Sequence, residues 1–126
     1  MRDQHGVQVD SIDLPVPTSR AAILAAFDTY FAQVAAGKAV KPKAAVIDHL
    51  TSATALNLPI KELVARCREH GVLSIVDGAH AIGQVDIDLK AMDPDFYVTN
   101  CHKWLFAPRA CGTPSRALSR IDVLLC

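Results

Sequence analysis

The sequence has 126 residues, which predicts one domain, and 51% hydrophobic with 21% charged residues is a balance typical of folded, globular chains. Thirteen basic and thirteen acidic side chains cancel, so the sequence lacks the basic surface that nucleic-acid or anionic-membrane binding requires. No apolar run approaches membrane-spanning length, and the polar N-terminus does not have the pattern of a secretory signal. We therefore expect a cytoplasmic protein without nucleic-acid or membrane partners.

The first predicted elements are a short edge strand and a helix. Residues 7–14 alternate loosely between apolar and polar side chains and end at Pro15, which favours an edge strand. Thr18 or Ser19 can cap a helix that ends near Ala36, before Gly37. Apolar side chains recur in this helix at helical spacing and predict one buried stripe: Ile23, Leu24, Phe27, Tyr30, Phe31 and Val34.

Three short apolar runs predict the strands of a sheet. They cover residues 44–48, 72–76 and 95–99, and we expect all three to be buried. A helix that opens at Pro59 and ends at Gly71 connects the first two. Strands that alternate with amphipathic helices predict an α/β fold, with a mostly parallel sheet flanked by helices. The inward-facing side chains of the connecting helix are expected to be Ile60, Leu63, Val64 and Cys67.

Polar side chains gather where these three strands end. Asp48 and His49 end the first strand, Asp77 ends the second, and residues 100–103 follow the third. In parallel sheets, ligands bind beyond the carboxyl ends of the strands. The sequence therefore predicts that three strand ends meet at one crevice.

Asp77 opens the run Asp77-Gly78-Ala79-His80. A carboxylate beside a glycine can approach a ligand closely, and next to a pyridine nitrogen it would keep that nitrogen protonated. The alternative is an aspartate that only caps the following turn. His80 could contact the same ligand, or it could be a hydrogen-bonded histidine of the core.

Lys103 follows the third strand, in the run His102-Lys103-Trp104-Leu105-Phe106. Apolar neighbours favour the uncharged amine that imine formation needs, because desolvation disfavours the ammonium. Alternatively, the lysine stem lies over Trp104 while its charge reaches water. Asn100 and His102 could donate hydrogen bonds to a phosphate, or could serve only the turn.

A metal site is the weaker interpretation of these residues. His49, His80, Cys101 and His102 do not form a compact ligand motif. The four cysteines are scattered and contain no Cys-x-x-Cys, which argues against a disulfide framework and favours a reducing compartment. We predict no metal.

The combined pattern is far more specific than its parts. A strand, Asp77-Gly78-Ala79-His80, another strand and then Asn100-Cys101-His102-Lys103-Trp104 resemble the pyridoxal-phosphate (PLP) dependent class V aminotransferase family. This family includes cysteine desulfurases, kynureninases and isopenicillin-N-epimerase-like proteins, and residues 48–52 and 100–104 are most similar to the epimerase-like branch. The resemblance covers residues 44–112 and is strongest over 72–109.

The resemblance implies a role for each matching residue. Lys103 would form the Schiff base with PLP and later move the Cα proton of an amino-acid substrate, while Asp77 would pair with the pyridine nitrogen. His80 stands where the family contacts the phenolic oxygen of the ring, often through glutamine. Asn100 and His102 fall at phosphate-contacting positions, the first of them often serine. Ser52, or its neighbour Thr51, takes the place of an asparagine beside the ring oxygen.

The sequence departs from the family pattern at both ends. Residues 1–40 lack the glycine-rich phosphate loop and the aromatic residue that stacks on the ring. Beyond Gly112 the family continues into an apolar strand, whereas here Pro114 and a polar run do not indicate one. We therefore expect residues 1–112 to be a partial PLP-binding large domain and 113–126 a divergent tail, as in a truncated chain. Complete members of the family are homodimers.

Two other functions remain open. A catalytically inactive α/β domain could persist as an interaction module, and the departures at both ends favour it. The intact set of Asp77, His80 and Lys103 favours an enzyme. A nucleotide-binding module would need a glycine-rich loop after the first strand, and the sequence has none.

Overall fold

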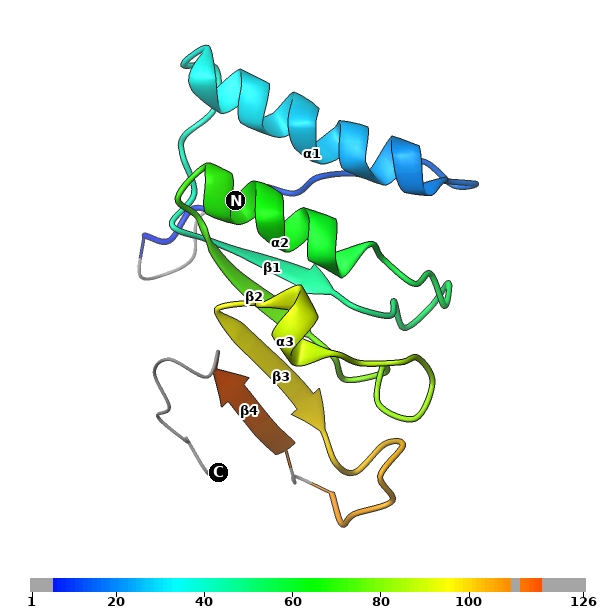
Figure 1. Cartoon of the computed structure of the whole chain (residues 1–126). Coiled ribbons are helices and arrows are strands. Elements are labelled where there is room, and N and C mark those ends of the chain that lie inside the picture. Colours follow the sequence, from blue (N-terminus) through cyan, green and yellow to red (C-terminus); the bar gives the residue numbers. More distant parts are fainter. Residues whose placement is uncertain (1–5, 110–111, 117–126) are drawn as a thin grey trace. The chain divides into compact units, whose positions relative to one another are not determined.

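The computed structural model describes residues 6–109 and the backbone of residues 112–116 (Figure 1). The chain forms two compact units, Met1–Val40 and Lys41–Cys126. Residues 117–126, most of the predicted divergent tail, lie outside the described part. None of the helices in that part has both the length and the apolar character needed to cross a bilayer.

The first unit contains helix α1 (Arg20–Ala35). Its N-cap is Ser19, whose side chain accepts a hydrogen bond from the Ala22 N–H, as the sequence predicts. Of the predicted stripe, three members are buried and the others half-buried. The strand expected over residues 7–14 is wrong: this segment is irregular apart from one bridge residue, and its side chains stay mostly exposed, so little burial stabilises a strand there. The buried members of the stripe are Ile23, Phe27 and Phe31.

The second unit is a four-stranded sheet with two helices. In chain order its elements are β1 (Ala44–Asp48), α2 (Ile60–Glu69), β2 (Leu73–Asp77), α3 (Leu89–Met92), β3 (Phe96–Asn100) and β4 (Gly112–Arg116). The strand order is β1-β2-β3-β4; the first three strands are parallel and β4 is antiparallel to β3. Both helices lie on one face of this sheet (Figure 1). The predicted α/β fold with a mostly parallel sheet is confirmed.

Helix α2 forms as its sequence predicts. It begins directly after Pro59, where the missing N–H of proline loses no helical hydrogen bond. Acidic Glu62 lies in its first turn and basic Arg66 and Arg68 in its last turn, which is the favourable arrangement for the helix dipole. All four predicted inward-facing side chains are buried and anchor the helix: Ile60, Leu63, Val64 and Cys67.

The sheet buries only one of its faces within the described residues. Burial alternates along each strand, so that Ile47, Val76 and Tyr97 are buried while Val46 and Val98 are exposed. The expectation of fully buried strands is therefore wrong for the chain as described. The alternation places every second side chain of β1, β2 and β3 on the face that α2 covers.

Strand β4 corrects a second expectation. Pro114 lies inside this strand and is paired in register with Val98 of β3. β4 stands at the end of the strand order, where a proline is tolerated because its missing N–H need not meet another strand. The prediction that Pro114 prevents a strand was wrong because it did not consider an antiparallel edge.

Candidate active site

The carboxyl ends of β1 and β2 and the loop after β3 line one pocket of about 150 Å³. The predicted convergence of three strand ends is thus present. The pocket is smaller than the roughly 300–1,000 Å³ of ligand sites in general. The lining residues are Asp48, Leu50, Ser52, Asp77, Ala79, His80 and Lys103.

Lys103 and His80 meet in this pocket. Lys103 Nζ lies 3.0 Å from His80 Nε2, and both side chains are partly buried. Twenty-three residues separate them in sequence, so the contact exists only because β2 and β3 are neighbouring parallel strands. The pair places an amine beside a nitrogen that can accept or donate a proton.

Asp77 contributes a carboxylate to the same pocket. Its Oδ1 accepts a hydrogen bond from the Ala79 N–H at 2.8 Å, which closes the turn after β2. Among the described residues nothing is hydrogen-bonded to the other oxygen. The capping interpretation and the ligand interpretation of Asp77 are therefore compatible, because one oxygen serves the turn and the other remains for a ligand.

The structure separates the two hydroxyl candidates near β1. Ser52 lines the pocket, whereas Thr51 serves its own turn. The Thr51 hydroxyl lies 2.7 Å from that of Thr54 and accepts a hydrogen bond from the Leu56 N–H at 2.8 Å. Ser52 is thus the hydroxyl available to a ligand.

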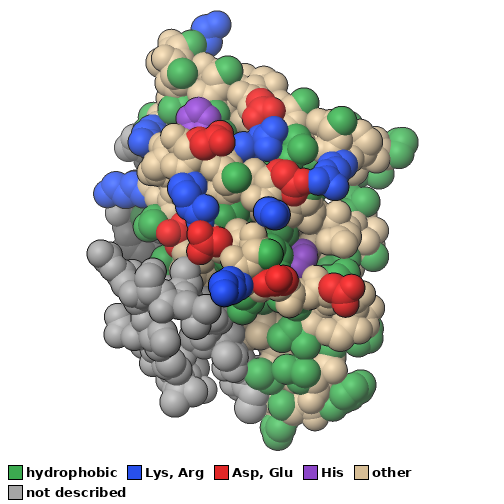
Figure 2. Space-filling view, viewed as in Figure 1, with side chains coloured by type: hydrophobic (Ala, Val, Ile, Leu, Met, Phe, Trp, Pro, Cys, Tyr) green, Lys and Arg blue, Asp and Glu red, His purple; other side chains and the backbone are tan. Residues whose placement is uncertain are grey.

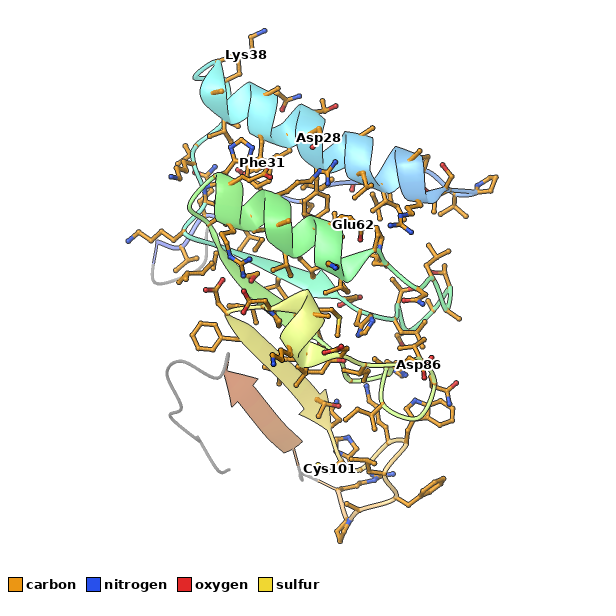
Figure 3. The ribbon with its side chains drawn as sticks, viewed as in Figure 1. Asp28, Phe31, Lys38, Glu62, Asp86 and Cys101 are labelled. Atoms are coloured by element: carbon orange, nitrogen blue, oxygen red, sulfur yellow. The ribbon has the colours of Figure 1, made fainter. Side chains whose placement is uncertain are left out.

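Asn100 and His102 do not line the pocket as the described residues form it. Asn100 is the last residue of β3 and pairs in register with Gly112 of β4. His102 follows Cys101, which Figure 3 labels beyond the end of that strand. Their predicted contacts to a phosphate are therefore not part of the pocket described here and stay a prediction.

The apolar residues after Lys103 do not enclose it. Trp104, Leu105 and Phe106 are exposed, Phe106 to 89%, and hydrophobic side chains gather on the surface over this loop (Figure 2). Phe106 also has a left-handed backbone (φ 55°), which costs energy for a residue other than glycine. The expected desolvation of Lys103 by these neighbours stays a prediction.

Sequence reasoning missed a buried hydrogen-bonded pair. Tyr97 Oη lies 3.0 Å from His49 Nδ1, and both residues are buried. Burial raises the pKa of Tyr97 to about 12, with a further contribution from the charge of Asp77. Burial also lowers the pKa of His49. The pair had no sequence signal except that Tyr97 alternates onto the buried face of β3 and His49 directly follows β1.

The metal interpretation gains no geometric support. No group of three or more His, Cys, Asp or Glu side chains is placed to hold a metal ion within residues 6–109. His49 instead bonds to Tyr97, and His80 to Lys103.

A family model named "Aminotransferase class-V" matches residues 27–113. The chain belongs to the class V aminotransferase family. This family is PLP-dependent, and the earlier resemblance is confirmed.

Two curated relatives illustrate the range of the family. The chain is 37% identical over 101 residues to an L-cysteine desulfhydrase-like protein, lolT1, of Epichloe uncinata, covering 80% of this chain and 22% of that one. It is 35% identical over 122 residues to isopenicillin N epimerase of Streptomyces clavuligerus, covering 96% and 29%. The chain thus spans between a fifth and a third of the length of these relatives.

Solved structures agree on the fold. Ureidoglycine-glyoxylate aminotransferase of Bacillus subtilis matches with a TM-score of 0.61 at 22% identity, over 72% of this chain and 23% of that one. At this identity the match establishes the PLP-dependent transferase fold alone.

The pocket residues fit PLP chemically. Lys103 supplies the amine that the aldehyde of PLP requires, and Asp77 supplies a carboxylate oxygen suited to a pyridinium N–H. His80 and Ser52 add an imidazole and a hydroxyl, which are polar groups of the kind that can hydrogen-bond to a ring oxygen. A cationic cluster for the phosphate is not among the lining residues of the described pocket, in line with its small volume.

Proposed function

We propose that this chain carries the lysine-bearing part of the active site of a PLP-dependent enzyme that acts on an amino-acid substrate. The observation that supports it most directly is the 3.0 Å contact between Lys103 Nζ and His80 Nε2, in a pocket that also holds Asp77. Family membership supports the same cofactor.

Each of the three residues has a distinct task in this proposal. Lys103 would hold PLP through its amine, and the same amine would accept the proton from the substrate Cα. His80 keeps the Lys103 amine oriented and exchanges a proton with it through the 3.0 Å contact. Asp77 directs one carboxylate oxygen at the pyridine nitrogen while Ala79 fixes the other. Bound PLP supplies a ring that delocalises the electron pair left on Cα.

We further propose an amino acid with a sulfur substituent on Cβ as the substrate class. The support is the similarity to a protein named as L-cysteine desulfhydrase-like. After proton removal from Cα, the electron pair would expel the sulfur as a thiolate, so the Cβ–S bond breaks and a Cα–Cβ double bond forms. The similarity to isopenicillin N epimerase favours a second outcome, in which the proton returns to the opposite face of Cα.

The remaining assignments rest on the family resemblance. We propose that Ser52 contacts the ring oxygen and that Asn100 and His102 contact the phosphate. We also propose homodimeric assembly, a cytoplasmic location, and no nucleic-acid or membrane partner. The exposed apolar loop at Trp104, Leu105 and Phe106 is compatible with a protein interface.

Lys103→Ala tests the proposed function. The full chain mixed with PLP should develop a visible absorption band, and borohydride should fix the cofactor to the peptide that contains Lys103. The variant should lose both signals. Lys90→Ala is the matched control, because Lys90 lies exposed in α3 and does not line the pocket.

Two results would contradict the proposal. Label spread evenly over the lysines would show nonspecific reaction with PLP. No band in the wild-type chain would favour the inactive α/β module instead.

A further inference from the structure

The buried pair of His49 and Tyr97 crosses the strand that carries Asp77. His49 follows β1 and Tyr97 belongs to β3, whereas β2 lies between these two strands. Their side chains nevertheless meet, with Oη 3.0 Å from Nδ1 and the ring planes at 87°. Because β2 lies between the two residues, their contact requires a small residue at the point where it crosses this part of the chain.

Gly78 provides the space. A Cβ added at this position would overlap the hydroxyl and two ring carbons of Tyr97. The Tyr97 ring therefore occupies the volume that any other residue at position 78 would fill. Gly78 is buried and directly follows Asp77. The contact between His49 and Tyr97 therefore lies against the turn that positions the Asp77 carboxylate.

Backbone hydrogen bonds connect Asp77 and Gly78 to the chain segments on both sides of β2. The His49 N–H donates to the Asp77 carbonyl at 2.8 Å, and the Gly78 N–H donates to the Val98 carbonyl at 2.7 Å. On the other side of the peptide, the Thr99 hydroxyl donates to the Gly78 carbonyl at 3.1 Å. The turn is thus fixed by backbone bonds in the plane of the sheet and by the aromatic pair on its buried face.

The protonation states suit a fixed hydrogen bond. Burial raises the pKa of Tyr97 to about 12, so its hydroxyl keeps its proton at neutral pH. Burial lowers the pKa of His49, which favours the neutral imidazole. The neutral imidazole and the protonated hydroxyl can hydrogen-bond to each other, with the donor set by the tautomer of His49.

We propose that His49 and Tyr97 are positioning residues that hold the Asp77–Gly78 turn so that the Asp77 carboxylate faces the cofactor pocket. The effect of this role on PLP binding rests on the proposed function, whereas the geometry of the turn does not require a cofactor. Neither residue is among those that line the pocket. Their effect passes through the turn.

Tyr97→Phe in the full chain tests the role without a change in volume. Tyr30→Phe is the matched control, because it also removes a tyrosine hydroxyl that is bonded to a side chain, Asp10, in the other unit. The first readout is amide hydrogen exchange without PLP. The Ala79 N–H, which donates to Asp77, should exchange about 2- to 13-fold faster in Tyr97→Phe, the factor expected for one lost hydrogen bond. Exchange of the Leu63 N–H in α2 should be unchanged.

The second readout is PLP binding, measured from the visible band. The dissociation constant should rise by about the same 2- to 13-fold in Tyr97→Phe and stay at the wild-type value in Tyr30→Phe. His49→Leu cannot hydrogen-bond to Tyr97 and should behave as Tyr97→Phe does. His49→Asn should have a smaller effect than His49→Leu, because its amide can still hydrogen-bond to the Tyr97 hydroxyl near the place of Nδ1.

The outcomes separate the two proposals. Unchanged Ala79 exchange in Tyr97→Phe overturns the positioning role whether or not PLP binds. Equal loss of protection at Ala79 and Leu63 also overturns it, because the pair would then serve only general stability. Faster exchange confined to the turn, with no band in the wild-type chain, supports the positioned turn and refutes the proposed function.

Discussion

Asp95 and Asp77 lie at opposite ends of the same parallel strands and are used in different ways. Asp95 precedes β3 at the amino end of the sheet, and its Oδ2 accepts hydrogen bonds from both the N–H and the hydroxyl of Ser74, each at 2.8 Å. The Asp95 N–H donates back to the Ser74 hydroxyl at 2.9 Å. Asp77 at the carboxyl end makes one such bond and faces a pocket with Lys103 and His80.

The difference shows what distinguishes a structural carboxylate from one available to a ligand. Asp95 is joined reciprocally to the start of β2, so removing it leaves buried donors without an acceptor. One carboxylate oxygen of Asp77 accepts the hydrogen bond of its own turn, and the other remains available to a ligand in the pocket. Residue type and burial are similar at the two ends, and the distinction lies in the partners.

The largest effect on stability is expected for Asp95→Ala. Ser74 is 1% exposed, and its N–H and hydroxyl would lose their shared acceptor. Each unpaired buried donor costs about 1–3 kcal/mol, so the loss of both should lower the free energy of unfolding by about 2–6 kcal/mol in urea titrations. Asp93→Asn is the control: its ion pair with Arg68 is exposed and should contribute about 1 kcal/mol or less. Comparable losses in the two variants would contradict the structural role of Asp95.

Asp77→Asn should give the opposite profile. The Asn side chain keeps an oxygen for the Ala79 N–H, so the free energy of unfolding should change little. The carboxylate that faces the pyridine nitrogen is lost, and a hydrogen bond to a charged group contributes about 1.5–3 kcal/mol. The dissociation constant for PLP, measured from the visible band, should rise about 10- to 150-fold. A loss of stability with unchanged PLP affinity would make Asp77 a purely structural residue like Asp95.

Gly78→Ala should destabilise the Asp77 end by a steric effect. The new methyl group would overlap the Tyr97 ring and hydroxyl, and overpacking of this kind costs about 1–3 kcal/mol. Thermal unfolding measures the loss. Gly83→Ala is an informative comparison, because that position has a positive φ of 76° and an added Cβ would meet only an ordinary contact, 3.8 Å from Trp104 Cβ, so its cost comes from the backbone instead. Retained His49–Tyr97 contact in Gly78→Ala would contradict the steric explanation.

The smallest effect concerns pH. The pKa of His49 is lowered from 6.5 in the folded chain, so the unfolded chain binds this proton more readily and stability falls as the pH drops below about 6.5. The pKa of Tyr97 is raised from 10.0 to about 12, so its contribution is full below pH 10 and is lost as the pH rises toward 12. Urea titrations across this range should show both declines. His49→Asn should weaken the acid decline and Tyr97→Phe the alkaline one, while Tyr30, whose pKa is also raised, leaves a remainder.

Local signals in the sequence were sufficient for most of the fold. Helix α2 followed from Pro59, Gly71 and an apolar stripe, and the three parallel strands from short apolar runs. Lys103, His80 and Asp77 could be placed in one pocket because parallel strands end at the same edge of a sheet. These features follow from the spacing of apolar residues within each segment and from the common direction of the strands, and both can be judged from short stretches of sequence.

The features that escaped prediction depend on contacts distant in sequence. His49 and Tyr97 are 48 residues apart, and their bond requires that no side chain be present at Gly78, directly after β2. Strand β4 escaped because Pro114 is acceptable only at an edge, and the order of strands in a sheet is not a local property. Residues 7–14 alternate in polarity but remain exposed, so the pattern alone did not produce a strand.

The absence of a side chain at Gly78 couples positions 78 and 97 in evolution. Glycine is required there to make room for an aromatic ring, and its conformational freedom is not what matters, since its φ does not lie in the left-handed region. An alanine at position 78 therefore becomes acceptable only with a smaller residue at position 97, which would no longer reach His49. Residues 78 and 97 should accordingly change together among related sequences, and a lineage that enlarges one of them must find another way to orient the aspartate before it.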